Sequence, residues 1–120
     1  MEALFIDHGD YIELIKPVGG IKMIAELGDD CIWEVAECCA KNCKAGGFSD
    51  WRLPTREELK QLYQVRKICG IRQCYGTFWS SSDDECRDDG KWAVDFYEMA
   101  AYPNSYKSYI HTKHSVLFVR

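Results

Sequence analysis

The first quarter of the chain alternates short apolar runs with turn-forming residues. The apolar runs cover residues 4–6, 11–15 and 21–25, and residues 9–10 and 17–20 separate them. Runs of this length, bounded by glycine, proline and aspartate, are typical of strands joined by turns. We therefore expect three strands before residue 26.

The pattern then changes to the period of a helix. One apolar stripe recurs at intervals of three and four residues, and it consists of Ile32, Val35, Ala36, Cys39, Ala40 and Cys43. Asp29 or Asp30 is expected to cap the start of this helix. Gly46 and Gly47 are expected to end it, because glycine tolerates the left-handed stop conformation.

A second helix is predicted after Pro54. Thr55 and Glu58 have the spacing of a capping box, in which each side chain bonds the backbone of the other residue. The inner face should carry Leu59, Leu62 and Tyr63, and the helix should end near residues 69–70.

The remaining sequence predicts strands at residues 77–81, 91–97 and 115–119, with Trp92, Val94 and Phe96 on one face of the second. The order of strands, two helices and strands indicates a single α+β domain over residues 1–120. Its core should bury these side chains: Trp33, Trp51, Trp79, Trp92, Phe96, Val116 and Phe118.

Composition narrows the possible partners. The formal net charge is -4 and no basic run exceeds two residues, which argues against nucleic acid. No apolar run approaches the roughly 20 residues of a membrane helix. The first seven residues are too short and acidic for a signal peptide, which favours the cytoplasm or a phage virion.

Cysteines and acidic residues offer weak metal-site candidates. Seven cysteines without a leader indicate mostly reduced thiols. Cys39 and Cys43 could bind zinc with Cys69 or Cys74, but no C-x2-C pair exists and buried free cysteine is the simpler reading. The acidic residues 83–89 are typical of a solvated loop rather than a calcium site. The three-residue spacing of His111 and His114 in an extended tail points them to opposite faces. We therefore expect no metal and no cofactor.

Five motifs occur in order: residues 31–36 (CIWEVA), 47–55 (GFSDWRLPT), 78–82 (FWSSS), 92–96 (WAVDF) and the closing 119–120. Together they resemble a branch of the C-type-lectin-like fold related to formylglycine-generating enzyme. That branch includes the C-terminal domain of bacterial collagen-like adhesins and the variable proteins of diversity-generating retroelements. The resemblance covers about residues 30–120 and implies two helices flanking a small twisted antiparallel sheet.

In the retroelement proteins, the segment after the Trp-Ser-Ser motif is diversified by randomising adenines in a template copy. Residues 102–111 look like such an output, with Lys107 as a fixed position, because Tyr, Asn, Ser and His dominate them. Tyr and Ser are also the usual residues of adaptable binding surfaces. The resemblance then implies an exposed ligand face for a protein or cell-surface ligand, made of Asp83, Asp84, Asp88, Asp89, Tyr97, Tyr102, Asn104, Ser105, Tyr106, Ser108, Tyr109 and His111.

Two other functions stay open. One is a carbohydrate- or glycosaminoglycan-binding adhesin domain, although the acidic balance disfavours sulfated glycans. The weaker one is a thiol-dependent enzyme, but the sequence shows no nucleophile–base signature, so no catalytic residue is assigned. For the segment around Trp51 and Arg52 we favour a structural role, with the tryptophan in the core and the arginine bracing the loop through carbonyl oxygens.

Overall fold

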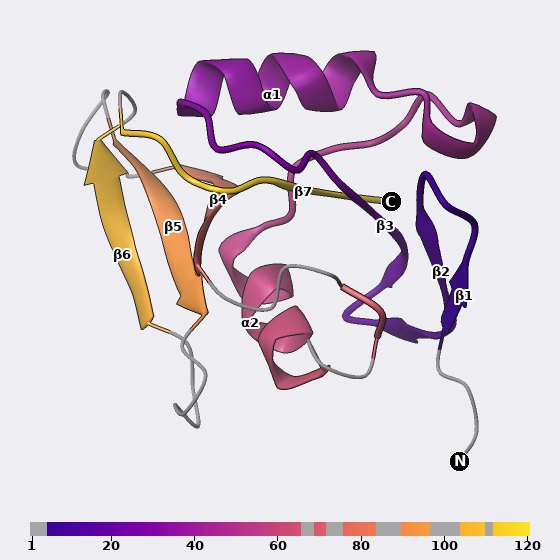
Figure 1. Ribbon diagram of the computed structural model, residues 1–120. Helices are drawn as coiled ribbons and strands as arrows, with labels where there is room; N and C mark the ends of the chain where they lie inside the picture. The colour runs from indigo at the N-terminus through magenta and orange to yellow at the C-terminus, as the bar shows by residue number, and fades with distance from the viewer. Residues whose placement is uncertain (1–4, 66–68, 72–75, 84–89, 97–103, 110–111) are drawn as a thin grey trace.

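The strands of the protein form two antiparallel sheets (Figure 1). The computed structural model describes residues 5–65, 69–71, 76–83, 90–96, 104–109 and 112–120. The first sheet has the order β1-β2-β3-β7 and the second β4-β5-β6. The strands are β1 (Phe5–Asp7), β2 (Ile12–Val18), β3 (Ile21–Glu26), β4 (Gly76–Asp83), β5 (Gly90–Phe96), β6 (Asn104–Tyr109) and β7 (Leu117–Val119). The predicted α+β class is confirmed, while the single small sheet is wrong.

Two sheets form because the C-terminal segment leaves the second sheet for the first. Ser115 donates its backbone N–H to Thr77 and accepts from Trp79, which holds it beside β4. Two residues later, β7 pairs with β3 in the register Ile24↔Val119. Figure 1 shows β7 in the middle of the molecule, at the edge of the first sheet.

Helix α1 (Trp33–Asn42) has the predicted position but different ends. Its N-cap is Ile32, without a side-chain cap, and Asp30 instead accepts a hydrogen bond from Ser115 Oγ at 2.8 Å. Ala36 and Ala40 are buried as predicted, whereas Val35 is 44% exposed. Small side chains therefore make the inner face of this helix, which lets it approach the second core cluster closely.

The expected glycine stop lies beyond the helix. The chain leaves α1 at Cys43, and Gly46 and Gly47 belong to a separate 3-10 turn, Ala45–Gly47, with φ of 65° and 82°. A Cβ on Gly46 would lie 2.5 Å from the ring of Tyr11. Glycine is required there by both the backbone angle and the contact with the first sheet.

Helix α2 (Arg56–Val65) begins as predicted. Glu58 N donates to Thr55 Oγ1 at 3.1 Å and Thr55 N donates to Glu58 Oε1 at 2.8 Å, which is a complete capping box. Leu59, Leu62 and Tyr63 are buried. Within the described residues the helix ends at Val65. The sequence predicted an end near residues 69–70, and residues 66–68, which lie between, fall outside the described residues.

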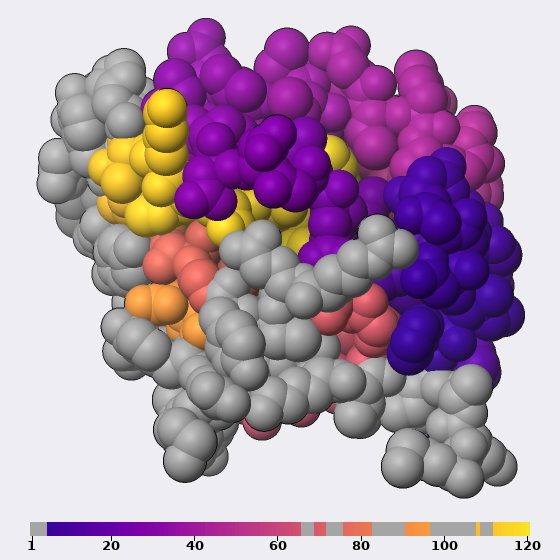
Figure 2. Space-filling view, viewed as in Figure 1, coloured from indigo at the N-terminus to yellow at the C-terminus, as the bar shows by residue number. Residues whose placement is uncertain are grey.

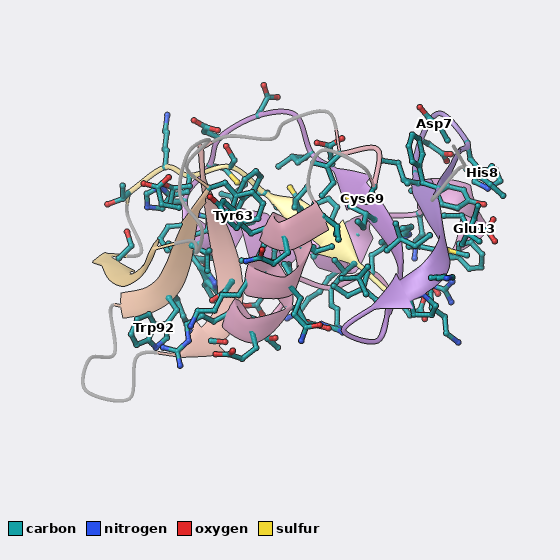
Figure 3. The ribbon with its side chains drawn as sticks, turned by 90° about the horizontal axis from the view of Figure 1, so that it is seen from below. Asp7, His8, Glu13, Tyr63, Cys69 and Trp92 are labelled. Carbon is teal, nitrogen blue, oxygen red and sulfur yellow. The ribbon has the colours of Figure 1, made fainter. Side chains whose placement is uncertain are left out.

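The core consists of two clusters. In the first, α2 lies between the sheets, and its leucines pack with Ile24 and Leu117 of one sheet and Phe78 and Val94 of the other. Figure 3 shows Tyr63 on this helix near the second sheet. In the second cluster, the buried face of α1 packs with Trp51, Leu53, Trp79, Ala93 and Phe118. Neither described helix is long and apolar enough to cross a membrane.

The predicted aromatic core is confirmed for four of its six members. Trp51, Trp79, Phe96 and Phe118 are at most 4% exposed, but Trp33 and Trp92 are only partly buried. Each of these two rings is covered by a cation: Lys91 Nζ lies 4.2 Å from the ring centroid of Trp33, and Arg56 lies 4.0 Å from that of Trp92. The alternation of β5 misplaced Trp92 because it does not distinguish a core neighbour from the stem of a basic side chain.

Candidate binding face and pocket

The tract that resembles a diversified segment forms strand β6. Of the predicted ligand residues, Asn104, Ser105, Tyr106, Ser108 and Tyr109 belong to β6, and Asp83 is the last residue of β4. The others, Asp84, Asp88, Asp89, Tyr97, Tyr102 and His111, lie outside the described residues. The sequence did not predict β6 as a strand, because its polar residues carry no apolar alternation.

The register of the second sheet brings the two parts of the predicted face to the same end. Lys91 in the central strand is the Cα partner of Asp83 on one side and of Ser108 on the other, and Gly90 pairs with Tyr109. Adjacent strands lie about 4.8 Å apart, so Asp83 and Ser108 are separated by about 10 Å across the sheet. The sheet therefore brings together two backbone positions that are 25 residues apart in the chain.

Ser108 does not belong to the exposed face that the sequence predicted. It is 6% exposed, and its Oγ lies 2.9 Å from Nε2 of His114. The ring of His114 in turn meets the buried ring of Trp79 edge-on, with centroids 4.6 Å apart. Ser108 thus attaches β6 to the core instead of lying on the exposed surface. A serine gives no sequence signal for this role, because its partner becomes a neighbour only in the folded chain.

His114 is a neutral contact in this arrangement. Burial lowers the pKa of its imidazole, and the carboxylates of Asp30 and Asp95 oppose that shift without reversing it. The neutral ring can exchange a hydrogen bond with the Ser108 hydroxyl in either tautomer. The attachment of β6 is therefore intact where His114 is unprotonated.

A pocket of about 430 Å³ lies beside the second sheet, between α1 and residues 51–53. Three buried residues form its apolar part: Ala40, Trp51 and Leu53. Trp33 and Ser81 also line it. The sequence did not predict this pocket, because its lining comes from four separate segments.

Charged side chains line the rest of the pocket: Glu37, Lys41, Arg52 and Lys91. Lys41 Nζ lies 2.9 Å from Glu37 Oε1 on the exposed surface of α1. Lys91, the residue that pairs with both Asp83 and Ser108, places its ammonium over Trp33. The pocket therefore adjoins the end of the sheet where the predicted ligand residues meet.

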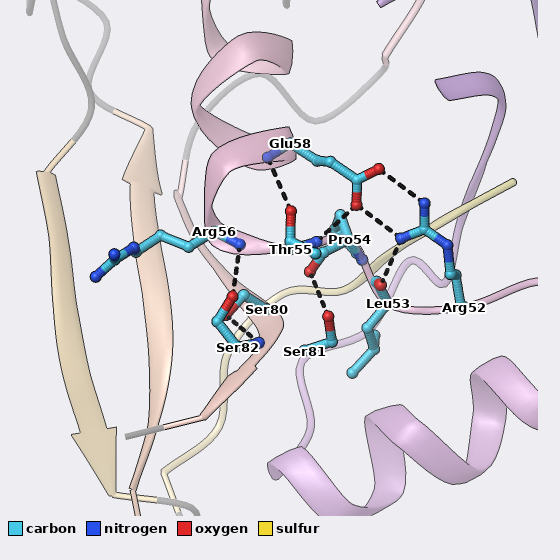
Figure 4. Close-up of polar contacts among 9 residues, drawn as sticks. All are labelled: Arg52, Leu53, Pro54, Thr55, Arg56, Glu58, Ser80, Ser81 and Ser82. Atoms are coloured by element: carbon cyan, nitrogen blue, oxygen red, sulfur yellow. Dashed lines mark hydrogen bonds and ion pairs between the residues drawn. The ribbon is translucent and has the colours of Figure 1, made fainter. Parts of the chain in front are cut away.

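The structural role expected for Trp51 and Arg52 is confirmed, with a different main partner for the arginine. Trp51 Nε1 donates to the carbonyl of Ala45 at 3.0 Å. Arg52 contacts the carbonyl of Leu53 only at 3.4 Å, while both of its Nη atoms bond the carboxylate of Glu58 at 2.7 Å (Figure 4). Arg52 also shares two backbone hydrogen bonds with Val119, so this loop is joined to β7.

Glu58 is the centre of that loop. Burial raises the pKa of its carboxyl, but the hydrogen bonds from Arg52 and Thr55 outweigh this and leave the pKa below its ordinary value. Ser81 and Ser82 of β4 complete the junction by bonding the carbonyl of Pro54 and the N–H of Arg56 (Figure 4). The polar residues of the third motif thus hold the start of α2 against the second sheet.

The candidate metal ligands are not brought together. Cys39 and Cys43 pack against the second core cluster, while Cys69 is buried in the first. Cys31, Cys38, Cys39, Cys43 and Cys69 are free thiols, and Cys74 lies outside the described residues. Among the described residues, no three His, Cys, Asp or Glu side chains are placed to hold a metal ion.

These features define a small α+β binding domain with a polar edge strand and an adjoining pocket. The chain belongs to the Lcl C-terminal domain family, whose model matches residues 20–120, and is a binding or adhesion-type domain. The match begins after the end of β2, so the hairpin of β1 and β2 precedes it. No curated protein and no solved structure matches the chain.

Proposed function

We propose that this protein is a non-enzymatic, C-type-lectin-like ligand-binding domain whose ligand face is diversified, as in the variable proteins of diversity-generating retroelements. The face centres on β6 and the adjoining end of β4. Its ligand is a protein or a cell-surface molecule.

The edge position of β6 is the observation that supports this proposal most directly. Within the described part of the chain, β6 pairs only with β5, from Asp95↔Asn104 to Gly90↔Tyr109. Ladder hydrogen bonds join backbone groups, which every residue except proline carries. A strand held in this way keeps its place while its side chains change.

Burial excludes one residue of β6 from the ligand face. Among the described side chains of the second sheet, those that form the two core clusters are Phe78, Trp79, Ala93, Val94 and Phe96, from β4 and β5. In β6 the described side chain is that of Ser108, which is buried. We therefore remove Ser108 from the ligand face and keep the other predicted residues. Position 108 should tolerate only small side chains.

The DNA around the gene tests the proposal that the ligand face is diversified. We expect a reverse transcriptase gene and a near-copy of the DNA that encodes residues 78–120. Differences between the two copies should fall on the codons of the retained ligand-face residues and should spare those of Trp79, Lys107 and Ser108. A locus without any near-copy would refute diversification. Differences spread evenly over the codons of the core strands β4 and β5 would refute it as well.

A further inference from the structure

The pocket between α1 and residues 51–53 has the size of a small-molecule site. Its volume of about 430 Å³ lies in the range of roughly 300–1,000 Å³ that is common for ligand pockets. Such pockets combine an apolar lining with a few polar groups. The described lining includes no residue of β6, so the proposed ligand face does not account for this pocket.

The inner part of the pocket is apolar. Trp51 and Leu53 are each 3% exposed and Ala40 is 2% exposed. The indole N–H of Trp51 donates to a backbone carbonyl at 3.0 Å, and that of Trp33 donates to another at 2.9 Å. Because both indole donors are bonded within the protein, these side chains offer a ligand only ring and hydrocarbon surface.

The charged side chains that line the pocket are already engaged. Lys41 Nζ lies 2.9 Å from Glu37 Oε1, and Arg52 holds the carboxylate of Glu58 with both Nη atoms at 2.7 Å. Lys91 places its ammonium over the indole ring at the start of α1 and has a further interaction within the protein. Each of the three cations among the described lining residues therefore has a partner before any ligand arrives.

This pairing favours ligands without charge. A charged ligand would lose water on entering and would have to displace an existing partner to find a counter-charge, and burying an unpaired charge is costly. An uncharged ring loses only its unfavourable contact with water, so apolar burial drives its binding.

We propose that this pocket binds a small uncharged molecule with a flat apolar ring, which packs on Trp51 and Leu53 while the surrounding charged side chains keep their partners. The site goes beyond the diversified face, because none of its described lining residues belongs to that face. Its ligand is therefore the same whatever the sequence of residues 102–111.

The tryptophans supply the readout. In a titration of the protein with benzyl alcohol, the NMR signals of the indole N–H groups of Trp33 and Trp51 should shift saturably. The signal of Trp92 should not, because adjacent residues of a strand point to opposite faces and Lys91 is the one that reaches Trp33. Benzoate and benzylammonium keep the ring but carry a charge, and each should bind at least about tenfold more weakly. Methanol lacks the ring and should give no saturable shift.

Two glutamates of α1 provide matched variants that test the role of charge pairing. Glu37→Gln removes the partner of Lys41 at the pocket, so benzoate should bind this variant about two- to threefold more tightly than the parent protein. Glu34→Gln makes the same change of charge on the same helix, outside the described lining, and should leave benzoate binding unchanged. Benzyl alcohol should bind both variants as it binds the parent. An unshifted indole signal of the buried Trp79 in each free variant shows that the core has kept its fold.

A titration in which benzyl alcohol gives no saturable shift up to its solubility limit would overturn the proposal, as would a charged analogue that binds as tightly as the alcohol. Shifts confined to Trp92, or equal benzoate binding by the two glutamine variants, would overturn it as well. None of these outcomes depends on sequence variation in the gene, so the pocket and the diversified strand can fail independently.

Discussion

Glu58 stabilises the loop before α2 through two sets of contacts at once. Its carboxylate accepts from Thr55 N and from both Nη atoms of Arg52, and its side chain is only 13% exposed. Arg52 is half exposed, so solvent screens much of the ion pair, and the cap contributes most of the benefit.

Replacing Glu58 with Ala should therefore lower the free energy of unfolding by about 1–2 kcal/mol, measured by urea denaturation. Glu57→Ala, which removes a mostly exposed neighbour, should change it by less than about 0.5 kcal/mol. Because the folded pKa of Glu58 is lowered, its contribution is present above the ordinary glutamate pKa and is lost as the pH falls through the lowered value. A Glu58→Ala protein as stable as Glu57→Ala would contradict this role.

His114 predicts a second pH dependence with a different window. Burial lowers its folded pKa below the ordinary value of 6.5, so the unfolded chain takes up the proton first. Stability should fall as the pH drops below about 6.5 and level off below the folded pKa. His114→Gln should remove this part of the thermal-stability profile between pH 7 and 5. His8→Gln, which alters the first sheet, should leave it in place.

For single residues, the sequence predicted hydrogen-bond partners that are close in the chain and missed those that only the fold brings together. Thr55 and Glu58 are three residues apart, so their reciprocal bonds follow from helix geometry alone. Asp30 was expected to cap α1, but it bonds Ser115, which is 85 residues away. Ser108 and His114 are a similar case, since only the fold makes the serine a buried contact. No local pattern identifies such pairs.

Strand β6 shows what a local pattern can and cannot indicate about an element. The regular stripe of α1 and the alternation of β5 predicted both elements correctly. The tract of β6 has neither, because its place depends on backbone pairing with β5. Its composition instead is the basis for the proposed binding role, while the pocket, assembled from α1, β4, β5 and residues 51–53, had no signal in any one segment.

An edge strand of this kind should separate stability from binding. Replacing Tyr102, Tyr106 and Tyr109 together with Ser should leave the melting temperature nearly unchanged, because the proposal places them on an exposed face, where substitutions usually cost less than about 0.5 kcal/mol each. The same variant should lose binding to an identified partner, because tyrosines dominate such interfaces. Unfolding of this variant would show that the tract is structural.

Ser108 supplies the contrasting substitution in the same strand. Ser108→Tyr forces a large side chain into a site that is 6% exposed and should cost about 1–3 kcal/mol in chemical denaturation. Ser108→Ala removes only the bond to His114 and should cost about 1 kcal/mol. If Ser108→Tyr were as stable as the triple tyrosine variant, position 108 would belong to the variable face after all.

The stability of the whole molecule depends more on the second core cluster than on Trp33 and Trp92, the two rings that cations cover. Trp79 is fully buried and bonds Cys31 O at 2.8 Å, whereas Trp92 is partly exposed beneath Arg56. Figure 3 places Trp92 at the opposite end of the molecule from His8 and Glu13, and Figure 2 shows the first hairpin as a separate flank. Trp79→Ala should therefore cost about 3–5 kcal/mol and Trp92→Ala less than half of that, by calorimetry. Equal losses would mean that Trp92 belongs to the core, as its alternation first indicated.

The position of β7 has a consequence for how the protein is made. Residues 117–119 complete the first sheet between β3 and the Arg52 loop, yet they are translated after every other strand. The sheet cannot close until these residues have emerged from the ribosome, so folding is delayed until synthesis has passed the tract. A chain that ended within residues 102–111 would lack β7 and would leave β3 without its partner on that side. The exposed strand edge would make such a chain a substrate for proteases.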